Sequence, residues 1–188
     1  MVRTLREVFK ADRERLVLST GAYNLLVGHL NIRRTLEKRL RQLREEGKVR
    51  HVGLSCHDRK FVGALADEGA IDVAMMRYNA AHRGAEQDIF PYLERHNTGV
   101  VSYTATRWRY LIKRPRGWPK GGRIPTAGEC YRFVLSNPHV HVCLTAPSNL
   151  GQLEENIAAF EQGPLSDQDM KFMMEFGDVV HDAGNWFM

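Results

Sequence analysis

Apolar residues along the chain gather in short runs, and the segments between them carry apolar residues at helical spacing. The runs are residues 15–20, 50–55, 71–78, 98–104 and 139–145. They are nearly continuous instead of strictly alternating with polar residues. Such runs predict strands that are covered on both faces, as in parallel sheets.

The segments between the runs predict helices. Ile32, Leu36, Leu40 and Leu43 form one apolar stripe, with basic residues elsewhere on the helix. Further helices are predicted over residues 60–69, 85–97, 126–137, 149–163 and 165–184. Thr126, Asn149 and Ser166 are the expected N-caps, and Gly69, Asn97 and Gly163 the expected C-terminal stops.

Five strands alternating with helices indicate an α/β fold, either a (β/α) barrel or a doubly wound sheet. No domain boundary is evident, so we expect one domain over residues 1–188. The long Gly/Pro-rich stretch at residues 113–125 is predicted to be a functional loop.

Composition narrows the class of protein. Hydrophobic residues make up 43% of the chain and charged residues 26%, and no apolar run approaches the roughly 20 residues that span a bilayer. The charged N-terminus lacks the apolar core of a signal peptide. The three cysteines, Cys56, Cys130 and Cys143, are an odd number at unrelated spacings. We therefore expect a cytoplasmic protein without a membrane partner or a disulfide framework.

The net charge of +5 is modest and lies largely between Arg33 and Arg50. It favours an anionic small ligand or a solvated helix face over nucleic acid.

Five phrases follow one another along the chain: RRTLEKRLRQL (33–43), REEGKVRHVGLS (44–55), RYNAAHR (77–83), GVVSYTAT (99–106) and SNLGQLEENIAA (148–159). In this order and spacing they resemble the later part of the aldo/keto reductases, and the resemblance covers roughly residues 5–181. It implies an incomplete TIM-type (β/α) barrel of about five parallel strands with intervening helices. It further implies an NADP(H)-dependent carbonyl oxidoreductase whose site lies at the C-terminal strand ends.

The same resemblance implies that the family's catalytic tetrad is missing. The tetrad's Asp and Tyr belong to an early barrel region without a counterpart in this chain. Gly21 stands where the family has Lys, and the strand that ends in His is skipped where Leu43 meets Arg44. We therefore predict no catalytic residue, and expect the family's reaction to be impaired or the fold repurposed.

Nine residues match positions that hold the cofactor in the family: Ser55, Cys56, Tyr103, Thr104, Ser148, Asn149, Gln152, Glu155 and Asn156. Cys56 and Met75 replace an Asn and a Gln that hold the carboxamide. Gln152 replaces the Arg that pairs with the 2′-phosphate, which weakens a preference for NADP. Arg107, Lys113 or Arg116 would cover a pyrophosphate. In the alternative interpretation, these residues cap helices and pack the barrel.

The residues also leave other functions open. Ser55 or Cys56, with His57 at a strand end, would suit an ester or lactone hydrolase. A non-catalytic binding or assembly module is the third possibility. Since an opened barrel bares strand edges and apolar side chains, we expect a homo-oligomer.

Three further patterns have structural interpretations that we favour. His139, His141 and Cys143 share a strand face, but their spacing is awkward for one metal ion, and no metal site is predicted. The aromatic residues Trp108, Tyr110 and Trp118 suit a loop that covers a cleft. A packing face is predicted from Met170, Phe172, Met173, Met174 and Phe176.

Overall fold

The computed structural model describes residue 38 and residues 41–184. Contacts divide the chain into residues 1–33 and residues 34–188, and the described residues all belong to the second unit. The strand predicted at residues 15–20, Gly21 and most of the stripe from Ile32 to Leu43 lie outside them. One domain over residues 1–188 therefore stays a prediction.

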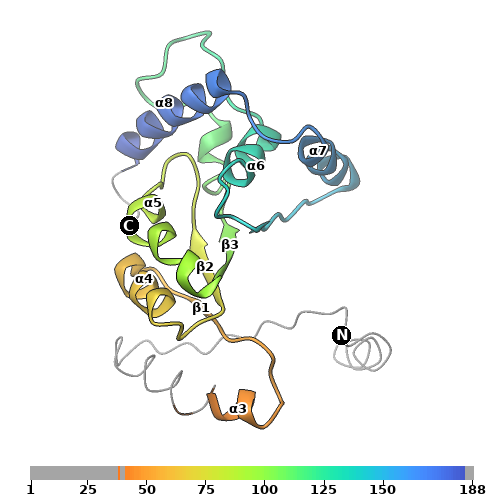
Figure 1. Cartoon of the computed structure of the whole chain (residues 1–188). Coiled ribbons are helices and arrows are strands. Elements are labelled where there is room, and N and C mark those ends of the chain that lie inside the picture. The colour runs from red at the N-terminus through yellow and green to blue at the C-terminus, as the bar shows by residue number, and fades with distance from the viewer. Residues whose placement is uncertain (1–37, 39–40, 185–188) are drawn as a thin grey trace. The chain divides into compact units, whose positions relative to one another are not determined.

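The sheet of the described unit is parallel (Figure 1). Its strands are β1 (Gly53–Ser55), β2 (Val73–Arg77), β3 (Gly99–Tyr103) and β4 (Val142–Cys143). They lie side by side in the order β1-β2-β3-β4, so each joins the next through a helical connection. The predicted α/β fold, as part of a (β/α) barrel, is confirmed.

The helices follow the predicted segments with one exception. They are α3 (Arg41–Glu45), α4 (Arg59–Asp67), α5 (Ala85–Asp88), α6 (Ala127–Leu135), α7 (Leu150–Glu161) and α8 (Asp167–Ala183). The single helix predicted over residues 85–97 is wrong. It is instead α5 followed by two 3₁₀ turns, η3 (Phe90–Tyr92) and η4 (Glu94–His96). Pro91 explains the break, because it lacks an N–H and disfavours helical geometry at the residue before it.

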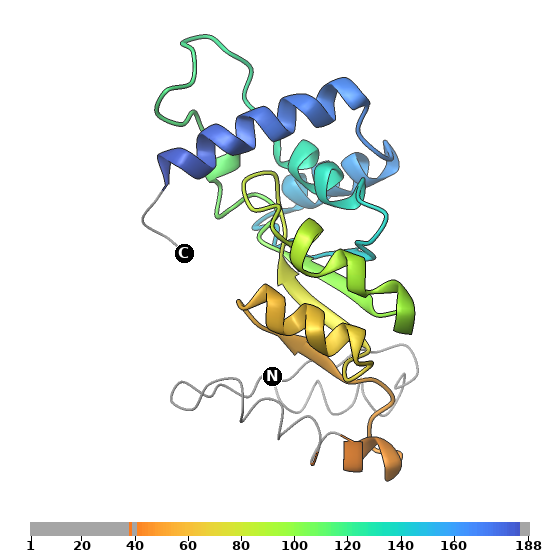
Figure 2. The same cartoon turned by 60° about the vertical axis from the view of Figure 1, so that its left-hand side comes forward.

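One face of the sheet is better covered than the other. Ala74 and Met76 on β2 and Val100 on β3 are buried. Helix α4 and the α5 segment cover one side of the sheet (Figure 2). The alternate positions Val73, Met75 and Val101 are half-buried. The sequence predicts strands that are covered on both faces. Within the described residues, only one face of the sheet is fully covered.

Helix caps agree with the sequence. The Thr126 hydroxyl accepts from the Glu129 N–H at 3.1 Å, and the Glu129 carboxylate accepts from the Thr126 N–H at 2.7 Å. Asn149 and Ser166 cap α7 and α8 in the same manner, by accepting from a backbone N–H three residues on. Gly69, Asn97 and Gly163 have positive φ angles after their helical segments, as helix stops do.

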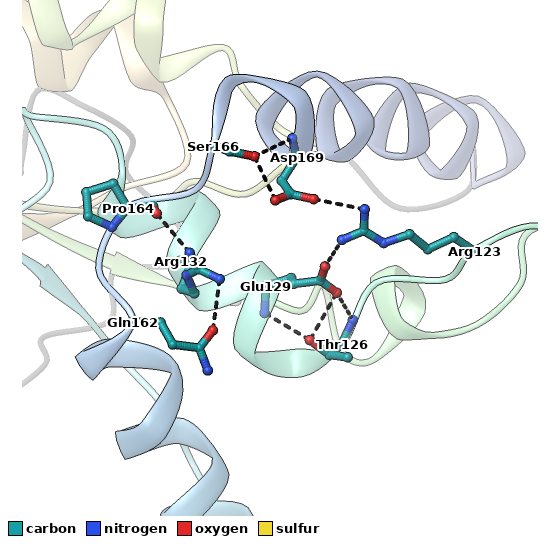
Figure 3. A network of polar contacts seen from close by, with 8 residues as sticks. All are labelled: Arg123, Thr126, Glu129, Arg132, Gln162, Pro164, Ser166 and Asp169. Atoms are coloured by element: carbon teal, nitrogen blue, oxygen red, sulfur yellow. Dashed lines mark hydrogen bonds and ion pairs between the residues drawn. The ribbon is translucent and has the colours of Figure 1, made fainter.

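Arginines fasten the C-terminal helices to one another (Figure 3). Arg123 pairs with Glu129 of α6 and with Asp169 of α8, the latter at 2.9 Å. Arg132 of α6 donates to the carbonyl oxygens of Gly163 and Pro164, both at 2.8 Å. These bonds fix the turn between α7 and α8 against α6.

Helix α8 buries part of the packing face that its sequence predicts. Met173 and Phe176 are fully buried, whereas Met174 is 38% exposed. Trp118 of the 113–125 loop packs edge-on against Phe176, with ring centroids 4.8 Å apart. This loop is therefore anchored on α8 by its Trp. No helix in the described part of the chain is long and apolar enough to cross a membrane.

We predict that Thr126→Ala lowers the free energy of unfolding by about 1 kcal/mol, because the N–H of Glu129 loses its cap. Urea denaturation followed by circular dichroism measures the change. Thr126→Ser is the matched control and should retain most of the stability. Equal midpoints for the Ala variant and the wild type would contradict the capping role.

Candidate functional site

The strand ends define one edge of the described sheet. Because the strands are parallel, Ser55, Arg77, Tyr103 and Cys143, which end β1 to β4, all lie at the carboxyl edge. In α/β folds this edge, where loops leave the strands, is where ligands bind.

Tyr103 lies at the centre of this edge. Arg77 is its direct neighbour in the β2–β3 register, and Ser55 lies close enough to influence the pKa of Tyr103. Burial raises the pKa of Tyr103, while Ser55 and Arg77 oppose part of that rise. The phenol is therefore neutral near pH 7 and able to donate a hydrogen bond.

Thr104, the next residue, is held in an unfavourable conformation. Its φ angle is +58°, a left-handed value that costs a β-branched residue about 1–2 kcal/mol. The side-chain amide of Asn79 donates to its carbonyl oxygen at 2.9 Å. Its buried hydroxyl has no hydrogen-bond partner in the part of the chain that the structure describes. Backbone strain together with an unsatisfied polar atom is typical of ligand sites.

The loop continues in left-handed geometry and carries a buried arginine. Arg107 is 5% exposed and donates to the carbonyl oxygens of Val180 and Gly184, at the C-terminal end of α8. A cation at this position complements the helix dipole. The expected pyrophosphate role of Arg107 does not fit this geometry, because its N–H groups are directed at α8.

His82 lies in the loop after β2, and its pKa reflects the charged side chains around it. Its Nδ1 lies 3.2 Å from the side-chain oxygen of Asn79, and its ring meets that of His181 edge-on. Burial lowers the pKa of His82 to about 3, with further lowering by Arg77, Arg107, His181 and Arg59. The potential here is positive, which favours an anionic ligand.

The predicted residues of α7 have capping roles. Asn149 accepts from the Gln152 N–H at 3.0 Å, and the Gln152 side-chain oxygen accepts from the Ser148 N–H at 2.8 Å. Asn156 donates to the Thr145 hydroxyl at 2.7 Å, while Glu155 lines a groove between α6 and α7. These contacts match the capping alternative. A cofactor role for the five predicted residues from Ser148 to Asn156 stays a prediction.

The edge thus brings together part of the predicted set, namely Ser55, Cys56, Tyr103 and Thr104. Arg77 and His82 were not predicted as site residues. Arg77 carried a signal, because it is a charged residue at the end of an apolar run. His82 carried none, since Arg59, Arg107 and His181, which also lower its pKa, are distant from it in sequence.

The other constellations have structural partners. His139 stacks on Phe90, and the His141 Nδ1 accepts from the Val100 N–H at 3.1 Å. Burial raises the pKa of Cys143 to about 12, which disfavours the thiolate that a metal requires. Within the described residues, no three His, Cys, Asp or Glu side chains are grouped to hold a metal ion.

Comparisons with known proteins identify the family of the chain. The model of the aldo/keto reductase family matches residues 13–108, slightly more than half of the chain. L-Galactose dehydrogenase of Arabidopsis thaliana is 22% identical over 171 residues, which cover 78% of this chain and 53% of that protein. The chain therefore spans about half the length of this curated relative.

Solved structures share the fold. The holo form of the aldo-keto reductase AKR11C1 from Bacillus halodurans superposes with a TM-score of 0.63 at 22% identity, over 79% of this chain and 58% of that one. The thermostable aldo-keto reductase Tm1743, in complex with the inhibitor epalrestat, gives 0.57 at 22% identity, over 93% and 65% of the two chains. At these identities the likeness shows the fold alone.

We predict that Thr104→Gly stabilises the protein by about 1 kcal/mol, since glycine adopts a positive φ without strain. The melting temperature should then rise by roughly 2–4 °C. Differential scanning calorimetry measures it. Thr106 does not have a left-handed φ angle. Thr106→Gly is therefore the matched control and should destabilise the chain. A fall in melting temperature for Thr104→Gly would contradict the strain.

Acid should destabilise the protein through His82. Its pKa of about 3 in the folded state lies below the ordinary value near 6.5, so the unfolded chain binds the additional proton. Stability is therefore lost as the pH falls from about 6.5 towards 3. In urea melts between pH 7 and 4, His82→Gln should lose less stability than the wild type. The exposed Met174→Gln should follow the wild type, and equal slopes for all three would refute this role.

Proposed function

The chain belongs to the aldo/keto reductase family, and from that premise we propose that it binds a nicotinamide dinucleotide at the carboxyl edge. The observation that carries the proposal is the cluster of Tyr103, Ser55 and Thr104. At one edge of the sheet lie the aromatic ring of Tyr103, the hydroxyl of Ser55 and the hydroxyl of Thr104. The Thr104 backbone is strained, and its hydroxyl has no hydrogen-bond partner among the described residues. The positive potential beside it suits the phosphates of such a ligand.

Each residue has a role that its position supports. The half-buried ring of Tyr103 offers a face for a planar ring, and the Ser55 hydroxyl lies close to it. The Thr104 hydroxyl offers an unused partner for a polar ligand atom. When bound, the dinucleotide would supply a hydride donor. Cys56 and Met75 fit less well, because neither side chain is an amide that can pair with a carboxamide.

We propose further that the family's carbonyl reduction is impaired in this chain. Gly21 cannot supply the charge that lowers the pKa of a catalytic Tyr, by comparison with the family pattern. The join between Leu43 and Arg44 falls inside the helix α3, so no strand with a catalytic His intervenes. The expected phenotype is cofactor binding with slow or absent turnover. The Gln152 side chain accepts from the Ser148 N–H and carries no positive charge for a 2′-phosphate. We therefore expect little difference between the affinities for NADP and NAD.

The hydrolase alternative has less geometric support. Within residues 41–184, no hydrogen bond joins Ser55 or Cys56 to His57. A nucleophile of this kind needs a base within hydrogen-bond reach. The hydrolase function stays a prediction, as does that of a non-catalytic module.

Titration of the protein with NADPH and with NADH, followed by nucleotide fluorescence, tests the proposal. We expect saturable binding of both, and an affinity about tenfold weaker in Tyr103→Ala, because stacking is worth about 0.5–1.5 kcal/mol. Tyr103→Phe retains the ring and should bind nearly as the wild type does. Tyr92→Ala, at a surface position 43% exposed on η3, is the matched control.

Binding that is undetectable at millimolar nucleotide would refute the proposal. Equal affinities for Tyr103→Ala and Tyr92→Ala would place the nucleotide elsewhere. Rapid reduction of aldehydes by the bound nucleotide would contradict the proposed impairment and leave the binding site standing.

A further inference from the structure

The segment between β3 and α6 carries a dense positive charge. Residues 107–123, named here the basic loop, contain seven basic residues and no acidic residue. Arg107 bonds to carbonyl oxygens at the end of α8, and Arg123 pairs with carboxylates of α6 and α8. The other five are exposed and have no ion-pair partner among the described residues: Arg109, Lys113, Arg114, Arg116 and Lys120. Such a density of unpaired cations favours a polyanionic ligand.

Two aromatic rings are exposed beside these cations. Trp108 is 58% exposed, and Tyr110, which begins the 3₁₀ turn η5 (Tyr110–Ile112), is 56% exposed. Trp118, by contrast, packs on Phe176 of α8. Rings at the surface next to guanidinium groups provide a platform for unpaired bases, because every base has an aromatic face.

A left-handed turn determines which side chains of the basic loop reach the surface. Arg107, Trp108 and Arg109 have φ angles of +47°, +50° and +73°, and none of them is glycine. The Tyr110 N–H donates to the Arg107 carbonyl oxygen at 3.0 Å and closes the turn. Arg107 is buried, whereas the three residues after it are exposed. Non-glycine residues held in this conformation are typical of functional sites.

The basic loop is anchored on the chain. The Trp118 Nε1 donates to the Arg123 carbonyl oxygen at 2.8 Å, and the Arg123 guanidinium lies 4.3 Å from the centre of the Phe172 ring. In both views the segment after η5 arches beyond α8, on the side away from the sheet (Figure 1, Figure 2). The exposed cations are therefore presented on a supported loop, which reduces the entropy lost on binding.

The side chains of the basic loop distinguish between classes of polyanion. A membrane-bound segment buries a continuous apolar face in the lipid. Leu111 is fully buried and Ile112 is half-buried, so the large apolar side chains left at the surface of the loop are Trp108 and Tyr110. Three of the five exposed cations are arginines, whose planar guanidinium groups match phosphate oxygens. Phosphates together with unpaired bases match both the cations and the rings.

We propose that the basic loop binds single-stranded nucleic acid. The five exposed cations contact the phosphate backbone, and Trp108 and Tyr110 stack on unpaired bases. A duplex binds more weakly, because its bases are stacked on one another and do not present their faces to the rings. The proposal does not rest on the nucleotide site at the carboxyl edge.

Anisotropy of a fluorescent dT strand of about 20 nucleotides, titrated with the full chain at about 50 mM salt, tests the proposal. We expect saturable binding, and binding at least about threefold weaker for the dA·dT duplex of the same length. A basic surface without stacking would prefer the duplex, because the duplex has the higher charge density. A uridine strand of the same length distinguishes RNA from DNA, and the tighter of the two single strands identifies the ligand.

Trp108→Ala tests the rings. We expect it to bind the dT strand at least about fivefold more weakly, with an unchanged salt dependence, because it removes a stacked base and no charge. Tyr92→Ala, which removes an exposed ring on η3, is the matched control and should bind as the wild type does. Equal affinities for the two variants would overturn the proposal.

Arg114→Gln/Arg116→Gln tests the cations. The slope of log K against the logarithm of the salt concentration should fall in magnitude by about 1.4, since each phosphate contact on a single strand contributes about 0.7. Lys60→Gln/Arg95→Gln, which removes two exposed cations elsewhere, is the matched control and should keep the wild-type slope. Equal slopes for the two double variants would exclude the phosphate contacts and, with them, the proposal.

The wild type alone can also contradict the proposal. A dT strand that stays free at about 100 µM protein would overturn it, as would a duplex that binds as tightly as the single strand or more tightly. Binding to phosphatidylserine vesicles but not to the strand would instead assign the basic loop to a membrane surface.

Discussion

The difference between the two faces of the parallel sheet is the constraint on which the described structure depends. Parallel strands are stable when apolar layers cover both faces. Ala74, Met76 and Val100 are buried, and the layer of α4 and the α5 segment covers one side of the sheet. The positions of Val73, Met75 and Val101 belong to the face that would point into a barrel, and they are half-buried. The candidate site lies on this less covered face.

The loop after β3 connects the site with the C-terminal helix. Thr104 takes up a left-handed conformation directly after the strand, and Arg107 inserts beneath α8 to reach the carbonyl oxygens at the end of that helix. Such strain persists when the surrounding structure holds it in place. α8 supplies that support through Met173, Phe176 and Val180, which are buried. The conformation of the site is thus stabilised by a helix far from it in sequence.

Family membership does not by itself establish the family's chemistry in this chain. The proposed binding role rests on the strand ends, where Ser55 and Tyr103 lie at the same edge of the sheet. The proposed impairment rests on Cys56, Met75 and Gly21, which by the resemblance stand where the family has polar or charged groups. Selection for folding preserves apolar periodicity and helix caps, and these do not require the reaction to be retained.

The sequence by itself determined the strands from residue 50 onward and the caps at Thr126, Asn149 and Ser166. Pro91 likewise determined the break within the helix predicted over residues 85–97. These features depend on neighbouring residues, through apolar periodicity, side-chain capping and missing N–H groups. Tertiary structure decided the rest. The strain at Thr104, the burial of Arg107 against α8 and the low pKa of His82 arise from segments that are distant in sequence and meet only in the fold.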